Sequence, residues 1–198
     1  MTSSTEHDRS NHLDRAFFER EAAAVAPELI GATLLIHGIG GTIVEVEAYD
    51  EDDPASHSHR GLTPRNAAMF GPPGHLYIYQ IYGLHWCLNL VCGPEGSGSA
   101  VLIRALEPVA GIDRMFARRD TSDLHNLCAG PGRLCQALGV DRAFNGLPID
   151  RPPVELWARH EAVDTVSGPR IGISRAKETA WRFSAKGSTF LSRPVSNI

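Results

Sequence analysis

Residues 74–89 constrain the fold of this chain more than any other segment. They read Gly-His-Leu-Tyr-Ile-Tyr-Gln-Ile-Tyr-Gly-Leu-His-Trp-Cys-Leu-Asn, so that two strand-like runs flank Tyr82-Gly83. Glycine favours the tight turns that join antiparallel strands. The pattern therefore predicts a β-hairpin over residues 75–91 with Tyr82 at its tip, where an aromatic ring has little core to join.

Tyr82 has two alternative roles at that tip. Its ring can fold back over the sheet, or it can be pushed between stacked bases. Tyr77 and Tyr79 share one face of the first hairpin strand, because successive side chains of a strand point to opposite faces. They fit either sheet packing or a stacking platform for a base.

A second predicted strand, residues 42–49, carries two carboxylates. Alternation places Glu45, Glu47 and Tyr49 on one face. The other face holds small or apolar residues: Thr42, Val44, Val46 and Ala48. Two carboxylates on one strand face are common at a solvated edge, and a catalytic site is the alternative. The nearby His57 and the hairpin aromatics weaken the case for a solvated edge.

The remaining pattern mixes helices with strands. Asp14 is placed to cap a helix over residues 15–25, and Pro131 begins another over residues 131–138. Further helices are expected at 26–31 and 108–119, and further strands at 32–37, 100–107, 170–173 and 182–185. This order is not a regular βαβ succession, so it predicts an α+β fold with a mixed, mostly antiparallel sheet, surrounding helices and a protruding hairpin.

Length and composition predict one domain with a packed core. The chain has 198 residues, of which 42% are hydrophobic, and domains commonly contain roughly 100–200 residues. There is no apolar run of about 20 residues to span a membrane, and the polar N-terminus lacks the apolar core of a secretory signal. We expect a cytosolic protein with residues 1–12 as a disordered leader and residues 13–198 as the single domain.

The charge of the chain is unevenly distributed. The formal net charge is −4, which by itself argues against a nucleic-acid partner. Residues 1–56 sum to −9, however, and residues 57–198 sum to +5. A chain can bind a polyanion through a local basic face while its total charge stays acidic.

Two groups of potential metal ligands have simpler interpretations. The four cysteines, Cys87, Cys92, Cys128 and Cys135, lack the usual C-x₂-C zinc spacing, and we expect them to be buried thiols. The acidic run 50–53 and His57 could hold Mg²⁺ or Mn²⁺, but such a run beside a proline in a loop is typical of solvated surface. No metal is predicted, and the role of the run stays open.

Three arginines are candidates for binding phosphate. Arg104 stands in an apolar strand, where a charge needs a partner, and that partner is either a buried carboxylate or a bound phosphate. Arg133 lies in the first turn of the helix that begins at Pro131, and helix N-termini suit phosphates. Arg142 follows shortly after this helix.

These residues together resemble a known family over roughly residues 13–193. The matching segments are residues 43–49, 55–58, 63–70, 73–79, 81–83, 102–108, 130–138 and 170–173. In their order and spacing the chain resembles the alkyladenine (3-methyladenine) DNA glycosylases of the mammalian and bacterial alkylpurine type. The turn at 93–99 differs in length from the mammalian form, and Ala180 replaces a proline found in many relatives.

The resemblance implies a monofunctional DNA glycosylase of base excision repair. Such an enzyme flips a nucleotide out of damaged double-stranded DNA and hydrolyses the N-glycosidic bond of an alkylated or deaminated purine. We also expect no cofactor, a monomer, and a bacterial cytoplasmic protein that meets the nucleoid through DNA. A noncatalytic nucleic-acid-binding module on the same fold is the alternative, and a metal nuclease that uses the acidic run is a third.

The resemblance also assigns roles by position. Glu47 resembles the general base that activates water, and Tyr82 the residue that enters the duplex. The pocket that holds the base is expected from Tyr49, His57, Tyr79, Asn89 and Ile171. The resemblance assigns a DNA backbone contact to Arg104, and Arg133 and Arg142 are expected to add such contacts because of their places at and after the helix that begins at Pro131. This scheme requires Tyr82, a ring-lined slot and Glu47 to meet in one cleft, with Glu47 not buried against an internal cation.

The two lysines bear on the type of glycosylase. A bifunctional enzyme needs an amine nucleophile for a Schiff base. Lys177 and Lys186 are the only lysines in the sequence, and both are far along the chain from Glu47 and the hairpin. Hydrolysis by water is therefore the predicted reaction.

Overall fold

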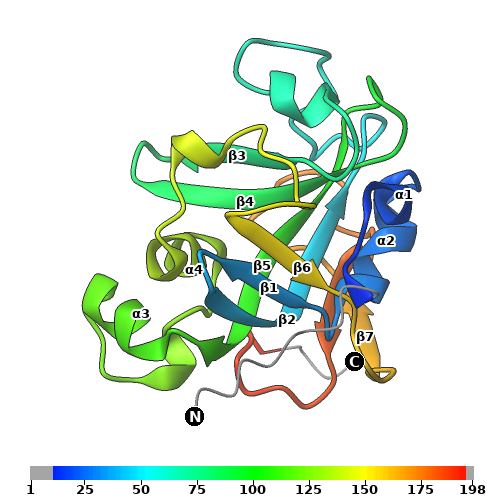
Figure 1. The fold of residues 1–198 in the computed structure, drawn as a ribbon. Helices are drawn as coiled ribbons and strands as arrows, with labels where there is room; N and C mark the ends of the chain where they lie inside the picture. Colours follow the sequence, from blue (N-terminus) through cyan, green and yellow to red (C-terminus); the bar gives the residue numbers. More distant parts are fainter. Residues whose placement is uncertain (1–10, 195–198) are drawn as a thin grey trace.

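The structure is a computed structural model that describes residues 11–194. Its centre is one curled, eight-stranded sheet in which every described pairing is antiparallel (Figure 1). The strands are β1 (Thr33–Ile36), β2 (Ile39–Tyr49), β3 (Leu76–Ile81), β4 (His85–Cys92), β5 (Ser99–Ala110), β6 (Val154–Trp157), β7 (Thr165–Gly168) and β8 (Arg182–Ala185). Their order is β3-β4-β5-β2-β1-β6, and β8 pairs with both β2 and β7. The α+β prediction is confirmed.

Four α-helices accompany the sheet: α1 (Arg15–Phe18), α2 (Ala22–Leu29), α3 (Ile112–Arg118) and α4 (Pro131–Leu138). Three 3₁₀-helices are η2 (Ala67–Phe70), η3 (Leu124–Asn126) and η4 (Arg142–Phe144). In Figure 1, α1 and α2 lie to the right of the sheet, and α3 and α4 lie at its lower left. Among the described residues, no helix has both the length and the apolar content needed to cross a bilayer.

The N-terminal helix is shorter than predicted. Asp14 caps α1 as expected, by accepting a hydrogen bond from the Phe17 backbone N–H at 3.2 Å. The helix then stops, because the Phe18 carbonyl accepts a hydrogen bond from Gly93 N–H, at 2.9 Å, instead of continuing the helical ladder. The predicted helices 15–25 and 26–31 are therefore replaced by α1 and α2.

The predicted leader, residues 1–12, lies mostly outside the described residues. Its last two members are described, and both contact the sheet. Asn11 donates a hydrogen bond to the Ala158 carbonyl at 3.3 Å. His12 forms a β-bridge with Trp157 and packs edge-on against its ring.

The sheet separates two apolar clusters. Leu76 and Ile78 belong to the large core, together with residues of α2 and α4. Tyr77 belongs to a small second cluster, and Tyr79 and Tyr49 pack against it. The predicted alternation of the first hairpin strand is confirmed, and it places the tyrosines on the face away from the large core.

Two of the three irregularities in the β2–β5 pairing orient the polar side chains. The register passes from Ile43 opposite Leu106 to Glu45 opposite Ala105, and then to Val46 opposite Ile103. One strand thus has an extra residue at Val44 and the other at Arg104, as in a β-bulge. The sequence predicts that Thr42, Val44, Val46 and Ala48 share one apolar face. This prediction is wrong for the first two of them, because Ile43 enters the large core in place of Val44, whereas Val46 and Ala48 do belong to that core.

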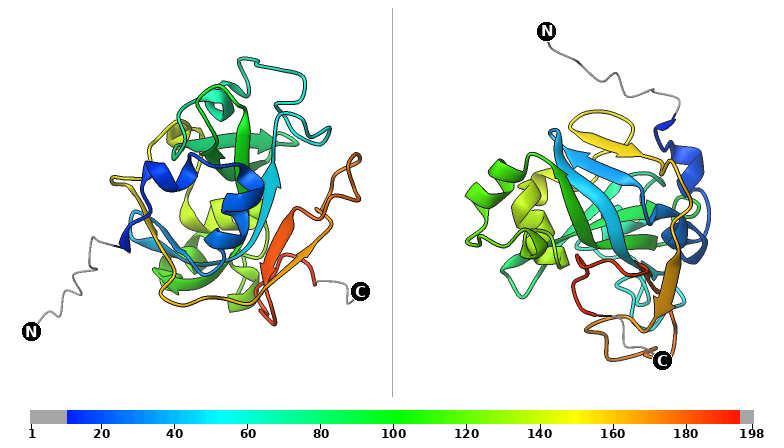
Figure 2. Two further views of the ribbon diagram at one scale, coloured as in Figure 1. Left: turned by 90° about the vertical axis from the view of Figure 1, so that its right-hand side faces the viewer. Right: turned by 90° about the horizontal axis from the view of Figure 1, so that it is seen from below.

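The late strands form a hairpin beside β2 (Figure 2). The predicted strand at 182–185 is confirmed as β8. The predicted strand at 170–173 is wrong, because those residues belong to the loop that joins β7 to β8, residues 169–181. This β7–β8 loop matters for the site, since Ile171 stands on it.

Candidate active site

One pocket of about 630 Å³ gathers most of the candidate residues. Its lining includes seven of the ten: Tyr49, His57, Tyr79, Tyr82, Asn89, Arg104 and Ile171. They come from β2, the long loop of residues 50–66, the β3–β4 hairpin, β5 and the β7–β8 loop. Glu47, Arg133 and Arg142 are not in its lining.

Aromatic rings form one wall of the pocket. The ring centroids of His57 and Tyr79 are 4.4 Å apart in an edge-on arrangement, and those of Tyr77 and Tyr79 are 5.4 Å apart. His57 Nδ1 and the Tyr77 hydroxyl are within hydrogen-bond distance at 3.0 Å. Burial raises the pKa of Tyr77 to about 12 despite the opposing charge of Arg65, so this hydroxyl stays protonated at neutral pH.

The loop that carries His57 is held by Asn66. The Asn66 side-chain amide donates hydrogen bonds to the His57 carbonyl at 2.9 Å and to the Gly61 carbonyl at 3.1 Å. Desolvation, followed by the nearby Arg65 charge, lowers the pKa of His57. His57 is therefore expected to present a neutral ring to the pocket at pH 7.

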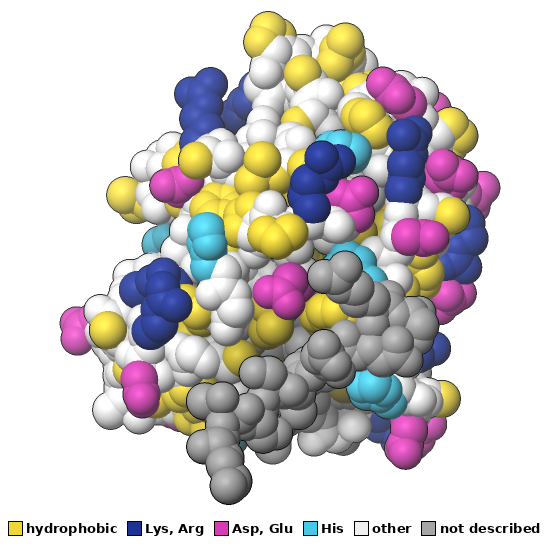
Figure 3. All heavy atoms as spheres, in the orientation of Figure 1, with side chains coloured by type: hydrophobic (Ala, Val, Ile, Leu, Met, Phe, Trp, Pro, Cys, Tyr) yellow, Lys and Arg dark blue, Asp and Glu magenta, His cyan; other side chains and the backbone are white. Residues whose placement is uncertain are grey.

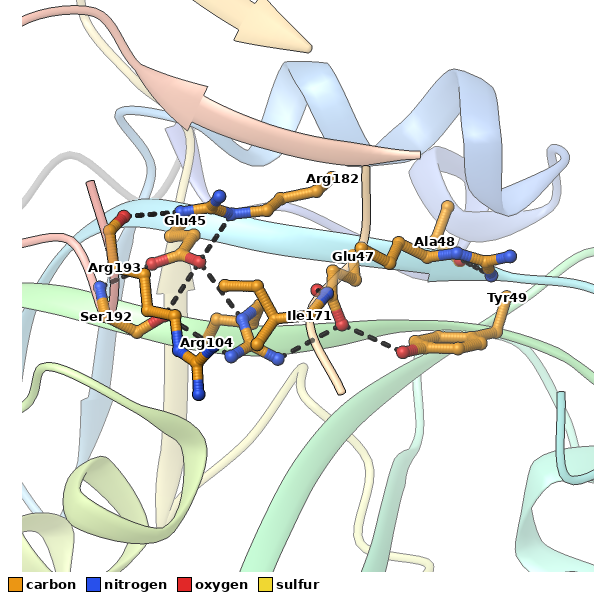
Figure 4. Close-up of polar contacts among 10 residues, drawn as sticks. Glu45, Glu47, Ala48, Tyr49, Arg104, Ile171, Arg182, Ser192 and Arg193 are labelled. Carbon is orange, nitrogen blue, oxygen red and sulfur yellow. Dashed lines mark hydrogen bonds and ion pairs between the residues drawn. The ribbon is translucent and has the colours of Figure 1, made fainter. Parts of the chain in front are cut away.

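Glu47 is fully buried directly behind this lining (Figure 4). Its Oε1 accepts a hydrogen bond from Ile171 N–H at 2.6 Å. Its Oε2 accepts one from the Tyr49 hydroxyl at 2.8 Å and one from Arg104 Nη1 at 3.1 Å. The expectation that Glu47 avoids an internal cation is wrong, yet all three of its partners line the pocket.

Glu45 lies between two buried arginines, Arg104 and Arg182, and forms an ion pair with each. Its Oε1 accepts hydrogen bonds from Arg104 Nε at 3.0 Å and Arg182 Nε at 2.8 Å. The Ser192 backbone N–H donates to Glu45 Oε2 at 2.6 Å, and the Ser192 hydroxyl donates to Glu45 Oε1 at 2.8 Å. The two carboxylates are therefore an internal network, and the solvated-edge interpretation of this strand face is wrong.

Arg104 donates hydrogen bonds to both Glu45 and Glu47. Of the two alternatives that the sequence left open for its partner, a buried carboxylate or a bound phosphate, the structure shows the buried carboxylate. Burial alone would lower the pKa of Arg104, but the Glu47 and Glu45 carboxylates raise it above the ordinary value. Its side chain is 8% exposed, and this small exposed part belongs to the pocket lining. The bulge at Arg104 aims the guanidinium at both glutamates.

Tyr82 stands at the hairpin tip, as the sequence predicts, and is 85% exposed. The turn of residues 81–84 closes through a hydrogen bond from Leu84 N–H to the Ile81 carbonyl. Tyr82 and Gly83 both have positive φ, 54° and 67°, as the central residues of a type I′ turn do. A bulky residue there is strained, and such strain is concentrated at functional positions.

Asn89 and Ile171 both lie at the pocket. Asn89 is buried on β4 opposite Tyr77, and its amide donates a hydrogen bond to the Tyr77 carbonyl at 2.9 Å. Ile171 is half-buried, and its backbone N–H donates the hydrogen bond to Glu47 Oε1 described above. Both were expected at the base-binding pocket.

Arg133 and Arg142 lie on the surface. Arg133 is in the first turn of α4, as predicted, and donates to Asn126 Oδ1 at 2.9 Å. Arg142 begins η4 and is exposed. Pro131, at the start of α4, is part of the pocket lining, so the α4 N-terminus approaches the pocket although Arg133 does not line it.

Sequence reasoning missed a buried ion pair between Asp53 and Arg170. Both side chains are almost inaccessible, 2% and 0% exposed. The interpretation of residues 50–53 as solvated surface is therefore wrong at Asp53. No spacing rule could have paired two residues that are 117 positions apart.

All four cysteines are buried free thiols, as predicted. Burial raises the pKa of each of them, which keeps them protonated. Within residues 11–194, no group of three or more His, Cys, Asp or Glu side chains is arranged to hold a metal ion.

A ring-lined pocket backed by a buried network of carboxylates and arginines suits the class of proteins that stack a flat aromatic group on their own rings. Comparisons with known proteins narrow this class. The model of the methylpurine-DNA glycosylase family matches residues 16–189. The chain belongs to this family of DNA glycosylases, which are hydrolases that act on N-glycosyl bonds in base excision repair.

Individual relatives agree over nearly the full length. The chain is 58% identical over 182 residues to a protein of Nitrobacter winogradskyi, covering 92% of this chain and 88% of the relative. It is 59% identical to one of Rhodopseudomonas palustris strain HaA2, covering 92% and 90%. A protein of Nitrosospira multiformis is 58% identical over 177 residues, covering 89% and 92%. All three are named "Putative 3-methyladenine DNA glycosylase". The family resemblance predicted from the sequence is confirmed.

Proposed function

We propose that this protein is a monofunctional glycosylase that removes alkylated or deaminated purines from double-stranded DNA after flipping the nucleotide out of the helix. One observation carries the proposal. Tyr82, the ring-lined pocket and the residues that hold Glu47 meet at one site. An enzyme that acts on a base inside a duplex must extrude it, which costs a few kcal/mol, and needs a residue to fill the gap.

The rings of Tyr49, His57 and Tyr79 would hold the extruded base. Stacking on an aromatic ring contributes about 1–3 kcal/mol per base, which offsets part of the cost of extrusion. Electron-rich rings also attract a cation within about 6 Å. A purine made cationic by alkylation is therefore favoured in this pocket, and its positive charge makes it a good leaving group.

Glu47 remains the proposed general base although it is buried against Arg104, because all three of its hydrogen-bond partners line the pocket. As the glycosidic bond stretches, the sugar gains positive charge, which a carboxylate stabilises. Glu47 would also accept a proton from the attacking water, an effect of typically about 10²–10⁴-fold. Because Glu47 has no exposed surface in this conformation, water reaches it only after a neighbour moves. Ile171 is the neighbour on Oε1 and stands on a loop.

The positions of the lysines support hydrolysis rather than lyase chemistry. Of the residues that the structure describes, neither Lys177 nor Lys186 lines the pocket. Lys186 Nζ lies 3.9 Å from Asp164 Oδ2, at the end of the β7–β8 hairpin opposite the β7–β8 loop. An amine nucleophile in contact with a bound sugar is therefore not provided by either side chain as placed.

DNA backbone contacts are proposed for Arg133 and Arg142, and for Arg104 through the part of it that faces the pocket. The face in Figure 3 carries cations and acids interspersed, without a continuous basic stripe on its described part. Two further exposed arginines, Arg60 and Arg175, lie in the pocket lining itself. They add to the proposed phosphate contacts, since arginine suits phosphate oxygens. We further propose one glycosylase domain over residues 13–198, acting as a monomer on nucleoid DNA in the bacterial cytoplasm.

A base-release assay tests the proposal. Duplexes with 3-methyladenine, 7-methylguanine, hypoxanthine or ethenoadenine are incubated with the wild type and with Glu47→Gln, with and without EDTA, and borohydride is added to trap any Schiff base. We expect base release that EDTA does not affect, no trapped adduct, and a Glu47→Gln variant that binds DNA but releases no base. Strand cleavage that needs a metal would favour a nuclease, and binding without release by the wild type would favour the noncatalytic module. Full activity of Glu47→Gln would show that Glu47 is not the general base.

A further inference from the structure

The Arg170 guanidinium stands behind the pocket and contacts several of its walls. Its Nη2 donates to Asp53 Oδ1 at 2.9 Å, and its Nη1 donates to Asp53 Oδ2 and to the Ala48 carbonyl. It also lies over the Tyr49 ring, 4.7 Å from the ring centroid, and 5.4 Å from that of Trp181. Arg170 itself does not line the pocket.

Two of these contacts, and the chain itself, lead from Arg170 to walls of the pocket. Tyr49 is reached directly, because the guanidinium covers its ring. The His57 loop is reached through Asp53, whose Oδ1 also accepts a hydrogen bond from Ala55 N–H at 3.0 Å. Ala55, like His57, lines the pocket. The third wall is Ile171, the residue next along the chain.

The Asp53–Arg170 ion pair orients its neighbours more than it stabilises the fold. Burying two opposite charges carries a desolvation penalty, and their attraction offsets this penalty only with good geometry. An apolar pair of similar volume would fill the same space. Arginine's planar fork, by contrast, fixes the orientation of a carboxylate through two hydrogen bonds while its face stacks on a ring.

We propose that Arg170 and Asp53 are positioning residues that set the distance between the Tyr49 wall, the His57 wall and Ile171, and so the fit of a flipped base. The inference rests on the proposed function of the pocket. Because Ile171 follows Arg170 in the chain, the Arg170–Asp53 pair also holds the Ile171 N–H that donates to the Glu47 carboxylate. Neither residue touches the base, so their effect is on placement of the groups that do.

The test compares Arg170→Lys and Asp53→Asn with wild type on duplex DNA that contains ethenoadenine. Lysine keeps the charge but loses the planar fork, and asparagine keeps the shape but loses the charge. Ethenoadenine fluorescence reports how the flipped base is stacked, and single-turnover base release reports the chemistry. The matched control is Arg118→Lys, because Arg118 donates to the Ala137 carbonyl and does not line the pocket.

We expect both pocket variants to lose base release by about 10²-fold, the scale of a small misplacement of reacting groups, and to change the ethenoadenine signal. Binding to undamaged duplex should stay within about twofold of wild type, and Arg118→Lys should behave as wild type. Should Arg170→Lys fail to fold, Asp53→Asn and the double variant Asp53→Leu/Arg170→Met carry the same test. We expect the double variant to fold, because removing both charges leaves no unpaired buried ion, and to release base slowly.

Wild-type release and fluorescence in Arg170→Lys and Asp53→Asn would overturn the proposal. So would an equal loss of binding to undamaged duplex, which indicates a general defect of the fold. If the wild type itself releases no base from any lesion, the proposed function fails. The fluorescence comparison then still tests whether the pair positions a bound base.

Discussion

The Tyr49 hydroxyl donates a 2.8 Å hydrogen bond to Oε2 of Glu47, the residue two positions before it on the same strand. One tyrosine thus supplies both a wall of the pocket and a donor to the buried carboxylate. Burial, together with the negative charge of Glu47, raises the pKa of Tyr49 above its ordinary value, so the phenol keeps its proton and remains a donor.

Tyr49→Phe should separate these two contributions. The ring stays, so DNA binding should stay near wild type. The buried Glu47 carboxylate loses one donor, which we expect to lower the unfolding free energy by about 1–3 kcal/mol and to slow base release. Urea unfolding and single-turnover kinetics measure the two effects. Tyr77→Phe is the contrast, since its hydroxyl contacts His57 and not Glu47. Equal stability and equal rate for Tyr49→Phe and wild type would contradict this view of the hydrogen bond.

Tyr82 should contribute to base release at a cost to the stability of the turn. Tyr82→Gly and Tyr82→Ala both remove the ring, and both should lose most base release from duplex DNA. Only glycine relieves the positive φ of 54°, which costs a side-chain-bearing residue roughly 1–2 kcal/mol. Thermal melting should therefore rank Tyr82→Gly above Tyr82→Ala. A melting order in reverse, or full base release by either variant, would count against the strained-tip account.

The exposed arginines of the pocket lining should make the affinity for DNA dependent on salt. Arg60→Gln and Arg175→Gln should each weaken binding for all sequences and lower the slope of log affinity against log salt by about 1. Titrations of fluorescent duplex at several salt concentrations give the slope. Arg151→Gln is the control, because that exposed arginine already pairs with Asp150 at 3.1 Å. Unchanged slopes for Arg60→Gln and Arg175→Gln would place the backbone contacts elsewhere.

His57 should make stability depend on pH in a known direction. Its pKa is lowered in the folded protein, whereas the unfolded chain has the ordinary value of about 6.5. Between these two values the unfolded state binds more protons, so the contribution of His57 to stability rises with pH and is lost as pH falls below about 6.5. The melting temperature of wild type minus that of His57→Asn should therefore be larger at pH 7.5 than at pH 5. The other histidines are common to both proteins and cancel. A difference that is constant over this range would contradict the lowered pKa.

Local patterns were sufficient to predict several elements. The hairpin followed from alternation around Tyr82-Gly83, and α4 from Pro131 and Gly139, because these signals act over a few residues. The burial of the cysteines followed from their apolar neighbours. The candidate pocket residues lie together largely because the hairpin and β2 present them on one face of the sheet.

Long-range pairings were not predictable in the same way. The extra residues at Val44 and Arg104 depend on the register between β2 and β5, which no single strand records. The burial of Glu47 follows from that register and from Ile171, 124 positions away. The sequence predicted a solvated run at residues 50–53 because Arg170, the partner of Asp53, lies in a loop for which the local pattern predicted a strand.

The bonds from Ser192 to Glu45 have a consequence for how the protein is made. A ribosome adds residues from the amino end, so the whole sheet has been synthesised before Ser192 and Arg193 emerge. Until then Glu45 lacks two of its donors, and Arg182 lacks the Arg193 carbonyl that it binds at 2.6 Å. The centre of the molecule is thus completed by a segment that is translated after all eight strands of the sheet.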